Sequence, residues 1–107
     1  MFTPYFTDVF GKNFHKLAKK DGVLKKRVET EIEEMKTDPY RNSRELVGEF
    51  LGKRRVKIGS HRFIYAICEE CRKKKHDLIL ACYGCKEKAD NSIIYFDLVH
   101  REGGYDD

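Results

Sequence analysis

Residues 53–67 (KRRVKIGSHRFIYAI) alternate apolar side chains with cations around a central glycine–serine pair. This pattern is typical of a two-residue β-hairpin with glycine at the first turn position. In that register Lys57 lies opposite Arg62, and the two-residue period of a strand places Arg55 on the same face. Because like charges directly opposite each other destabilise a hairpin, this face suits an anionic ligand. The alternative is an ordinary solvated sheet face.

Four cysteines form a second chemical motif. Cys68 and Cys71 make one C-x2-C pair, and Cys82 and Cys85 make another after ten intervening residues. This spacing predicts a tetrahedral zinc site with four thiolate ligands, each pair forming a knuckle. Four protein ligands leave no position for water, so the zinc is expected to be structural. Two disulfides, or a redox or iron site, are the alternatives, and His76 between the pairs is not expected to be a ligand.

Composition limits the class of protein. The chain has 107 residues, 37 % of them charged, and a net charge of +4, which indicates one soluble globular domain. The cations are clustered, which favours a polyanionic partner. No stretch approaches the roughly 20 apolar residues of a membrane span, and the N-terminus lacks the pattern of a signal peptide. We therefore expect a cytoplasmic protein with no membrane partner.

The hydrophobic pattern predicts an α+β fold. The expected elements are a strand over 2–6, helices over 9–20 and from 24 to about 38, strands over 54–58 and 61–67, a short apolar run over 77–81 and a strand over 92–100. We expect the two N-terminal helices to pack on one face of a twisted antiparallel sheet. All 107 residues form a single domain in this interpretation. The cysteines lie in a small zinc lobe inserted at about 68–90.

The ordered set of motifs resembles the RelE/ParE toxin superfamily, and within it the RelE branch. The resemblance spans nearly the whole chain and is carried by two N-terminal helices, the phrase DPYRNSRELVGEF, the hairpin core RVKIGSHRFIY, and a terminal His-Arg followed four residues later by tyrosine. Known members are small cytoplasmic toxins that cleave mRNA, typically in the ribosomal A site, and are neutralised by a cognate antitoxin. The resemblance implies the same fold, with the ribosome, mRNA and an antitoxin as partners.

The resemblance also assigns roles to residues. It implies a catalytic set of Arg55, Lys57, Arg62, Arg101 and Tyr105. The RNA-binding set expected around them is Lys53, Arg54, His61, His100, Lys73 and Lys74. At position 61 this chain has histidine where the family usually has tyrosine.

Metal-independent RNA cleavage requires the 2′-OH to attack the adjacent phosphate, which gives a cyclic phosphate and a free 5′-OH. Arginines suit the charge that develops on phosphorus, because their guanidinium groups match phosphate oxygens and stay protonated. Lys57 suits a base or an electrostatic partner, Tyr105 suits stacking on a base, and His61 or His100 suits proton transfer. Two other functions remain open: a ParE-like toxin that inhibits DNA gyrase without cleaving RNA, and a zinc-containing nucleic-acid-binding module on a degenerate toxin fold.

Overall fold

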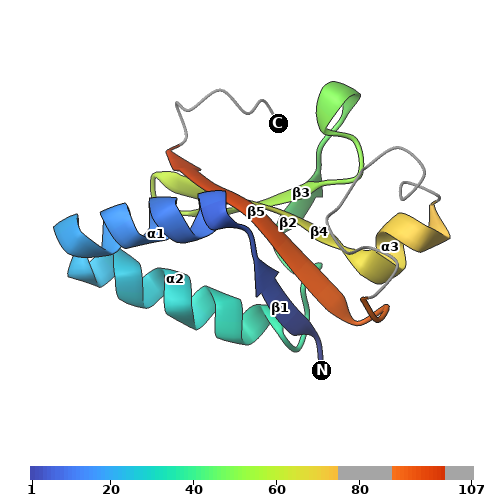
Figure 1. The fold of residues 1–107 in the computed structure, drawn as a ribbon, viewed down its shortest axis with the longest axis horizontal. Coiled ribbons are helices and arrows are strands. Elements are labelled where there is room, and N and C mark those ends of the chain that lie inside the picture. Colours follow the sequence, from blue (N-terminus) through green and yellow to red (C-terminus); the bar gives the residue numbers. More distant parts are fainter. Residues whose placement is uncertain (75–87, 101–107) are drawn as a thin grey trace.

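The computed structural model describes residues 1–74 and 88–100. Its elements are β1 (Thr3–Phe6), α1 (Asp8–Lys20), α2 (Gly22–Met35), β2 (Ser43–Glu45), the 3₁₀ turn η1 (Gly48–Phe50), β3 (Arg54–Ile58), β4 (His61–Ile67), α3 (Cys68–Lys73) and β5 (Ser92–His100). The strands of this part of the chain form one sheet in the order β1-β5-β4-β3-β2. The helices α1 and α2 lie together beside the sheet (Figure 1), so the predicted α+β class is confirmed.

A single aspartate joins the two long helices. Thr7 begins α1 by accepting a hydrogen bond at Oγ1 from the backbone N–H of Phe10 (3.2 Å). The backbone N–H of Asp21 donates to the carbonyl of Leu17 (3.0 Å) at the end of α1. Its carboxylate then accepts from the N–H of Leu24 (3.0 Å) and caps α2. Because one residue serves both helices, they turn back on each other with almost no loop.

The sheet is mixed, and the expected all-antiparallel sheet is wrong at one edge. β1 pairs in parallel with β5, in the register that places Thr3 beside Ser92 and Phe6 beside Tyr95. The other three pairings are antiparallel. Because β1 runs parallel to β5, α1 begins directly after the end of β1 and can pack back against β5. This direction depends on pairing between residues about 90 positions apart, which the local pattern of residues 2–6 does not reveal.

The core lies between the helices and one face of the sheet. Phe10 of α1 packs against Phe63 of β4 and Tyr95 of β5, with ring centroids 5.7 and 5.4 Å away. Two buried tyrosines complete it: the hydroxyl of Tyr65 donates to the carbonyl of Pro39 (2.6 Å), and that of Tyr95 donates to the sulfur of Met35 (3.3 Å). Burial raises the pKa of Tyr65 to about 12, so this hydroxyl stays protonated at neutral pH.

Three short elements were not predicted: β2, the 3₁₀ turn η1 and α3. β2 extends the sheet beside β3, although its three residues are too few to show a strand period. α3 begins at Cys68, where the first C-x2-C was expected to form a knuckle. The apolar run over 77–81 lies outside the described residues.

The hairpin turn generates a test of backbone strain. Gly59 has a φ of +58° and Ser60 has a negative φ, which is the pattern of a type II′ turn. A Cβ at position 59 would also lie 3.1 Å from Nη1 of Arg27. We expect Gly59→Ala to lower the free energy of unfolding by about 1–2 kcal/mol, measured by urea denaturation.

Gly11→Ala is the matched control, because a Cβ at this position in α1 would meet nothing within 4 Å. This change is expected to raise the free energy of unfolding by about 0.5–1 kcal/mol. If both alanine variants shifted stability in the same direction and by the same amount, the strain assigned to Gly59 would be wrong.

Candidate nucleic-acid interface

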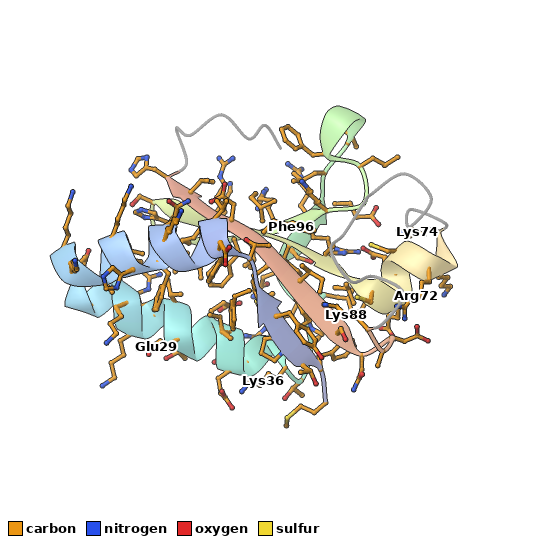
Figure 2. All side chains as sticks on the ribbon, in the orientation of Figure 1. Glu29, Lys36, Arg72, Lys74, Lys88 and Phe96 are labelled. Carbon is orange, nitrogen blue, oxygen red and sulfur yellow. The ribbon has the colours of Figure 1, made fainter. Side chains whose placement is uncertain are left out.

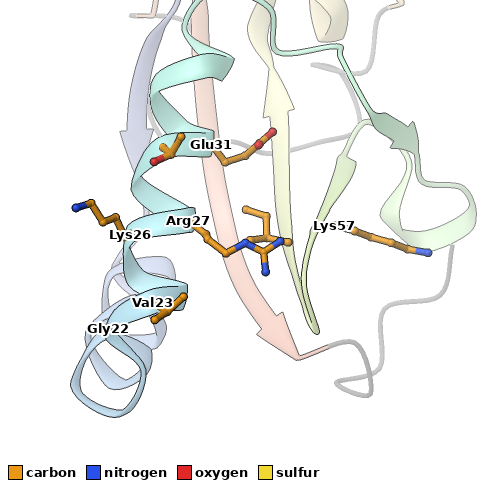
Figure 3. Close-up of a pocket in the computed structure, with 8 residues that line it drawn as sticks. Gly22, Val23, Lys26, Arg27, Glu31 and Lys57 are labelled. Carbon is orange, nitrogen blue, oxygen red and sulfur yellow. The ribbon is translucent and has the colours of Figure 1, made fainter.

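The β3–β4 hairpin has the predicted register. Lys57 pairs with Arg62 and Arg55 pairs with Ile64. The intervening residues Val56 and Phe63 are buried in the core beneath the helices. The three cations therefore lie on the sheet face that turns away from α1 and α2, and Figure 3 shows Lys57 pointing away from α2. We name Arg55, Lys57 and Arg62 the cation face.

The members of the cation face differ in burial. Lys57 is exposed, Arg62 is half-buried, and Arg55 is only 8 % exposed. The Nε atoms of both arginines are shielded from solvent. The solvated-face alternative therefore fits Lys57 but not Arg55. A guanidinium held partly out of water interacts more strongly with a phosphate than a fully hydrated one does.

Two further residues extend this face. Arg44 of β2 is exposed and is the cross-strand partner of Arg55. It was missed because β2 itself was not predicted. Lys53, an expected RNA contact, places its ammonium 4.7 Å from the ring centroid of Phe96 on β5 and 6.0 Å from that of Phe50. Both residues add positive charge beside the cation face.

The structure does not bring His61 and His100 to the cation face. They are cross-strand partners, and their rings meet edge to face with centroids 5.2 Å apart. Alternation along β4 places His61 with Phe63, on the helix side of the sheet, while Arg62 points to the opposite side. Burial, followed by the neighbouring His100, lowers the pKa of His61, against a smaller opposing effect of Asp21. A direct proton transfer between these histidines and a phosphate on the cation face does not fit this geometry.

Arg54, another expected RNA contact, already has a carboxylate partner. Its guanidinium donates to both oxygens of Glu70 (2.7–3.0 Å) and to the hydroxyl of Ser43 (2.9 Å). The ring of Tyr40 lies 5.0 Å from its central carbon. Burial alone would lower the pKa of Arg54, but the hydrogen bonds and charge of Glu70 outweigh it and raise that pKa. The geometry is that of a structural ion pair between β3 and α3, and an RNA contact by Arg54 stays a prediction.

The cations of α3 lie at the end of the molecule away from the hairpin turn, as Figure 2 shows for Arg72 and Lys74. Lys74 pairs with Glu45 and lies 3.8 Å from Glu70. Lys73 is exposed. The predicted RNA contacts of Lys73 and Lys74 are therefore well separated from those of the hairpin, and they stay predictions.

Cys68 and Cys71 occupy the first turn of α3, and each is 4 % exposed. Residues three apart share one side of a helix, so the two thiols suit one shared ion as a pair of ligands. The thiol of Cys71 also donates to the carbonyl of Gly52 (3.5 Å). Within residues 1–74 and 88–100, no group of three or more metal-binding side chains gathers.

Several expected site residues lie outside the described residues. They are Cys82, Cys85, Arg101 and Tyr105. Within the described ranges, no helix is both long enough and apolar enough to cross a membrane.

Comparison with solved structures identifies the fold. No protein-family model matches the sequence, and no curated protein matches it. The chain is similar to the RelBE2 toxin–antitoxin complex of Mycobacterium tuberculosis (TM-score 0.64, 21 % identity, 94 % of this chain and 98 % of that chain). It is also similar to the YoeB/ParE toxin of Agrobacterium tumefaciens (TM-score 0.66, 12 % identity, 92 % and 96 %). The YoeB–YefM complex of Staphylococcus aureus gives a TM-score of 0.63 at 10 % identity, covering 94 % of this chain and 97 % of that chain.

The buried ion pair yields a stability prediction. The side chains of Arg54 and Glu70 are 13 % and 7 % exposed. Glu70→Ala leaves a buried guanidinium without its main partner, so we expect the free energy of unfolding to fall by about 3–5 kcal/mol in chemical denaturation. Glu33→Ala is the control, because the Glu33 side chain is 71 % exposed in its pair with Lys36. It should cost less than about 1 kcal/mol. Equal losses would mean that the Arg54–Glu70 pair does not brace α3.

At these low identities the likeness establishes the fold, and it confirms the predicted resemblance at that level: the chain has the fold of the RelE/YoeB toxins.

Proposed function

We propose that this protein is a toxin of a toxin–antitoxin system that cleaves mRNA on the ribosome. The observation that carries the proposal is the in-register pairing of Lys57 with Arg62 on the sheet face turned away from the helices, with Arg55 buried beside them. A protein gains nothing in stability from opposing two cations across a ladder. A phosphate bound over them would convert this repulsion into attraction.

The chemistry assigned to the cation face is transesterification. The 2′-oxygen of a ribose bonds to the adjacent phosphorus, the bond from phosphorus to the 5′-oxygen of the next nucleotide breaks, and the products are a 2′,3′-cyclic phosphate and a 5′-hydroxyl. Arg55 and Arg62 would stabilise the negative charge on the phosphorane. Lys57, the exposed member, would take the proton of the 2′-OH or bind the phosphate electrostatically. Arg101 and Tyr105 remain proposed participants on the strength of the family resemblance alone.

The proposed partners are the ribosome with its mRNA, and a cognate antitoxin. Support for the antitoxin comes from the similar structures, two of which are a toxin–antitoxin complex named RelBE2 and a complex named YoeB–YefM. Support for mRNA comes from the cation face. A gyrase inhibitor of the same fold would not require phosphate-directed cations on β3 and β4, so we rank that function second. A nucleic-acid-binding module without activity ranks third.

Translation of an mRNA in vitro, with cut sites mapped by primer extension, tests this function. The wild-type protein is expected to cut at positions set by the codon in the ribosome. Lys57→Ala and Arg62→Ala should each reduce the cleavage rate by about 10²-fold or more, because each removes charge stabilisation of the transition state. The thermal midpoint of each variant is measured alongside, so that a loss of folding is not read as a loss of cleavage.

Lys25→Ala provides the matched control, since it removes an exposed cation on the outer surface of α2. Its cleavage rate should equal that of the wild type. Unchanged cutting by the Lys57→Ala/Arg62→Ala double variant would remove the cation face from the mechanism. Intact mRNA together with inhibited supercoiling would favour the gyrase function, and intact mRNA with RNA binding alone would favour the inactive module.

We also propose that a structural zinc ion is held by the four cysteines. Support comes from the buried, same-side thiols of Cys68 and Cys71 on α3, and from the second C-x2-C at Cys82 and Cys85 in the sequence. When bound, zinc would crosslink α3 to the segment before β5. A domain of this size has a thin core, so such a crosslink would add appreciably to its stability.

Metal analysis of the purified protein tests this site. We expect one zinc per chain, loss of zinc in Cys82→Ser, and a fall of at least about 5 °C in the thermal midpoint after chelation. His76→Ala should retain the metal. Protein without metal and without free thiols would instead contain two disulfides, and metal-free protein with four free thiols would also contradict the proposal.

A further inference from the structure

Ion pairs gather at one end of the molecule. Arg54, Arg72 and Lys74 pair with carboxylates around α3. Lys36 and Arg41 pair with glutamates near the end of α2. In the described part of the chain, the cations of α1 and of the first half of α2 form no ion pair. These cations lie at the end that holds the β3–β4 turn, opposite α3 (Figure 1).

A basic hollow lies beside this turn on the helix side of the sheet. Its α1 wall consists of Asn13, Lys16, Leu17 and Lys20, whose spacing of three, four and seven residues defines a single helix face. Its sheet wall consists of the ends of β4 and β5, with the facing rings of His61 and His100. The hollow has a volume of about 390 Å³.

A second hollow lies on the α2 side of the same turn. It has a volume of about 510 Å³ and is lined by Lys26, Arg27 and Lys57, among others. Figure 3 shows Arg27 reaching from α2 toward the hairpin, where its Nη1 would lie 3.1 Å from a Cβ at Gly59. The two hollows and the cation face thus meet at one hairpin tip.

Among residues 1–74 and 88–100, the carboxylates near the tip are few, and most are engaged. Asp97 accepts a hydrogen bond from Asn13 (2.5 Å). Asp21 caps α2, although its charge also acts on His61. Glu31 lines the α2 hollow, and burial raises its pKa. The described residues around the tip therefore carry a surplus of positive charge.

We propose that a second stretch of RNA backbone binds around the hairpin tip, with Lys16 and Lys20 of α1 and Arg27 of α2 as its phosphate contacts. The proposal rests on the proposed function, in which RNA already lies on the cation face. His61 and Arg62 are consecutive residues that point to opposite sides of the sheet. An RNA chain bound at Arg62 therefore needs only to pass around the hairpin turn to reach the basic hollow. The source is either the mRNA itself or ribosomal RNA.

RNA fits this surface better than an acidic protein does. A protein interface needs an apolar centre surrounded by a polar rim. Three of the exposed large apolar residues, Tyr5 and Phe6 of β1 and Val9 of α1, lie away from the tip, whereas exposed Val23 lines the α2 hollow. At the tip the cations come from four elements, α1, α2, β3 and β4. Such a distribution follows a charged backbone, and a valine among these cations does not form the apolar centre of a protein interface.

Binding measurements over a range of salt concentrations test the proposal. The probe is a single-stranded RNA with 2′-O-methyl riboses, which cannot be cut by 2′-OH attack, and a second arm uses purified small ribosomal subunits. The slope of log K against log salt is about −0.7 per phosphate contact for a single strand. Lys16→Gln/Lys20→Gln removes two proposed contacts, so it should make the slope less steep by about 1.4 with whichever of the two RNA samples binds at this surface.

Lys12→Gln/Lys19→Gln is the matched control, because it changes the same helix by the same charge without touching the hollow. Its slopes should equal those of the wild type. A reduced slope with the oligonucleotide identifies mRNA as the source, and one with the subunit alone identifies ribosomal RNA. Wild-type slopes for Lys16→Gln/Lys20→Gln in both arms would overturn the proposal.

His61 provides a second readout. A phosphate in the hollow favours the charged imidazole, so bound RNA should raise the pKa of His61 in an NMR titration. His100 and Asp21 act on this ring from the adjoining elements, and Lys16 and Lys20 line the same hollow. A polyglutamate peptide that raised it while RNA did not would overturn the proposal in favour of an acidic protein. Unchanged cutting by Lys57→Ala/Arg62→Ala would overturn the proposed function, whereas wild-type slopes for Lys16→Gln/Lys20→Gln would overturn the second RNA contact, so the two proposals fail separately.

Discussion

The register of the β3–β4 hairpin is the constraint on which the rest of the structure depends. Because strand side chains alternate, a slip of one residue would turn Lys57 toward the helices and expose Val56. The positive φ of Gly59 fixes a two-residue turn and so fixes the register. Core burial supports the same choice, since Val56, Ile58, Phe63 and the helices form one apolar cluster. The same turn thus decides both the packing of the core and the face on which the three cations lie.

Local patterns in the sequence were sufficient for the hairpin, the two helices and the last strand. Each has a clear period and its own start or stop signal, such as Asp21 between the helices. They were insufficient for β1, whose direction is set by pairing with residues far along the chain, and for β2, which is stabilised by its neighbour β3. The basic partner of Arg55, Arg44, was missed with β2 for the same reason.

The candidate site was predictable where alternation decides the face of a residue, and unpredictable where tertiary pairing decides its role. Arg55, Lys57 and Arg62 share a face as expected. Sequence pattern does not reveal that Arg54 has a carboxylate partner on α3, because Glu70 lies sixteen residues away. Nor does it reveal that β5 places His100 beside His61, because the two residues are 39 positions apart in the sequence. Positive charge alone therefore does not show which side of the sheet a residue faces, or whether it already has a carboxylate partner.

The one-residue connection at Asp21 has a consequence for how this fold can change. With its backbone ending α1 and its carboxylate beginning α2, the turn has no residue that can be lengthened without losing a cap. The segment between α3 and β5, by contrast, joins two elements that are held together by the hydrogen bond from the backbone N–H of Glu69 to the carbonyl of Asp90 (3.0 Å). New sequence can enter there while the hairpin register stays intact. We therefore expect insertions to be tolerated at the α3 end of the molecule, and the end that holds the hairpin turn to accept only substitutions.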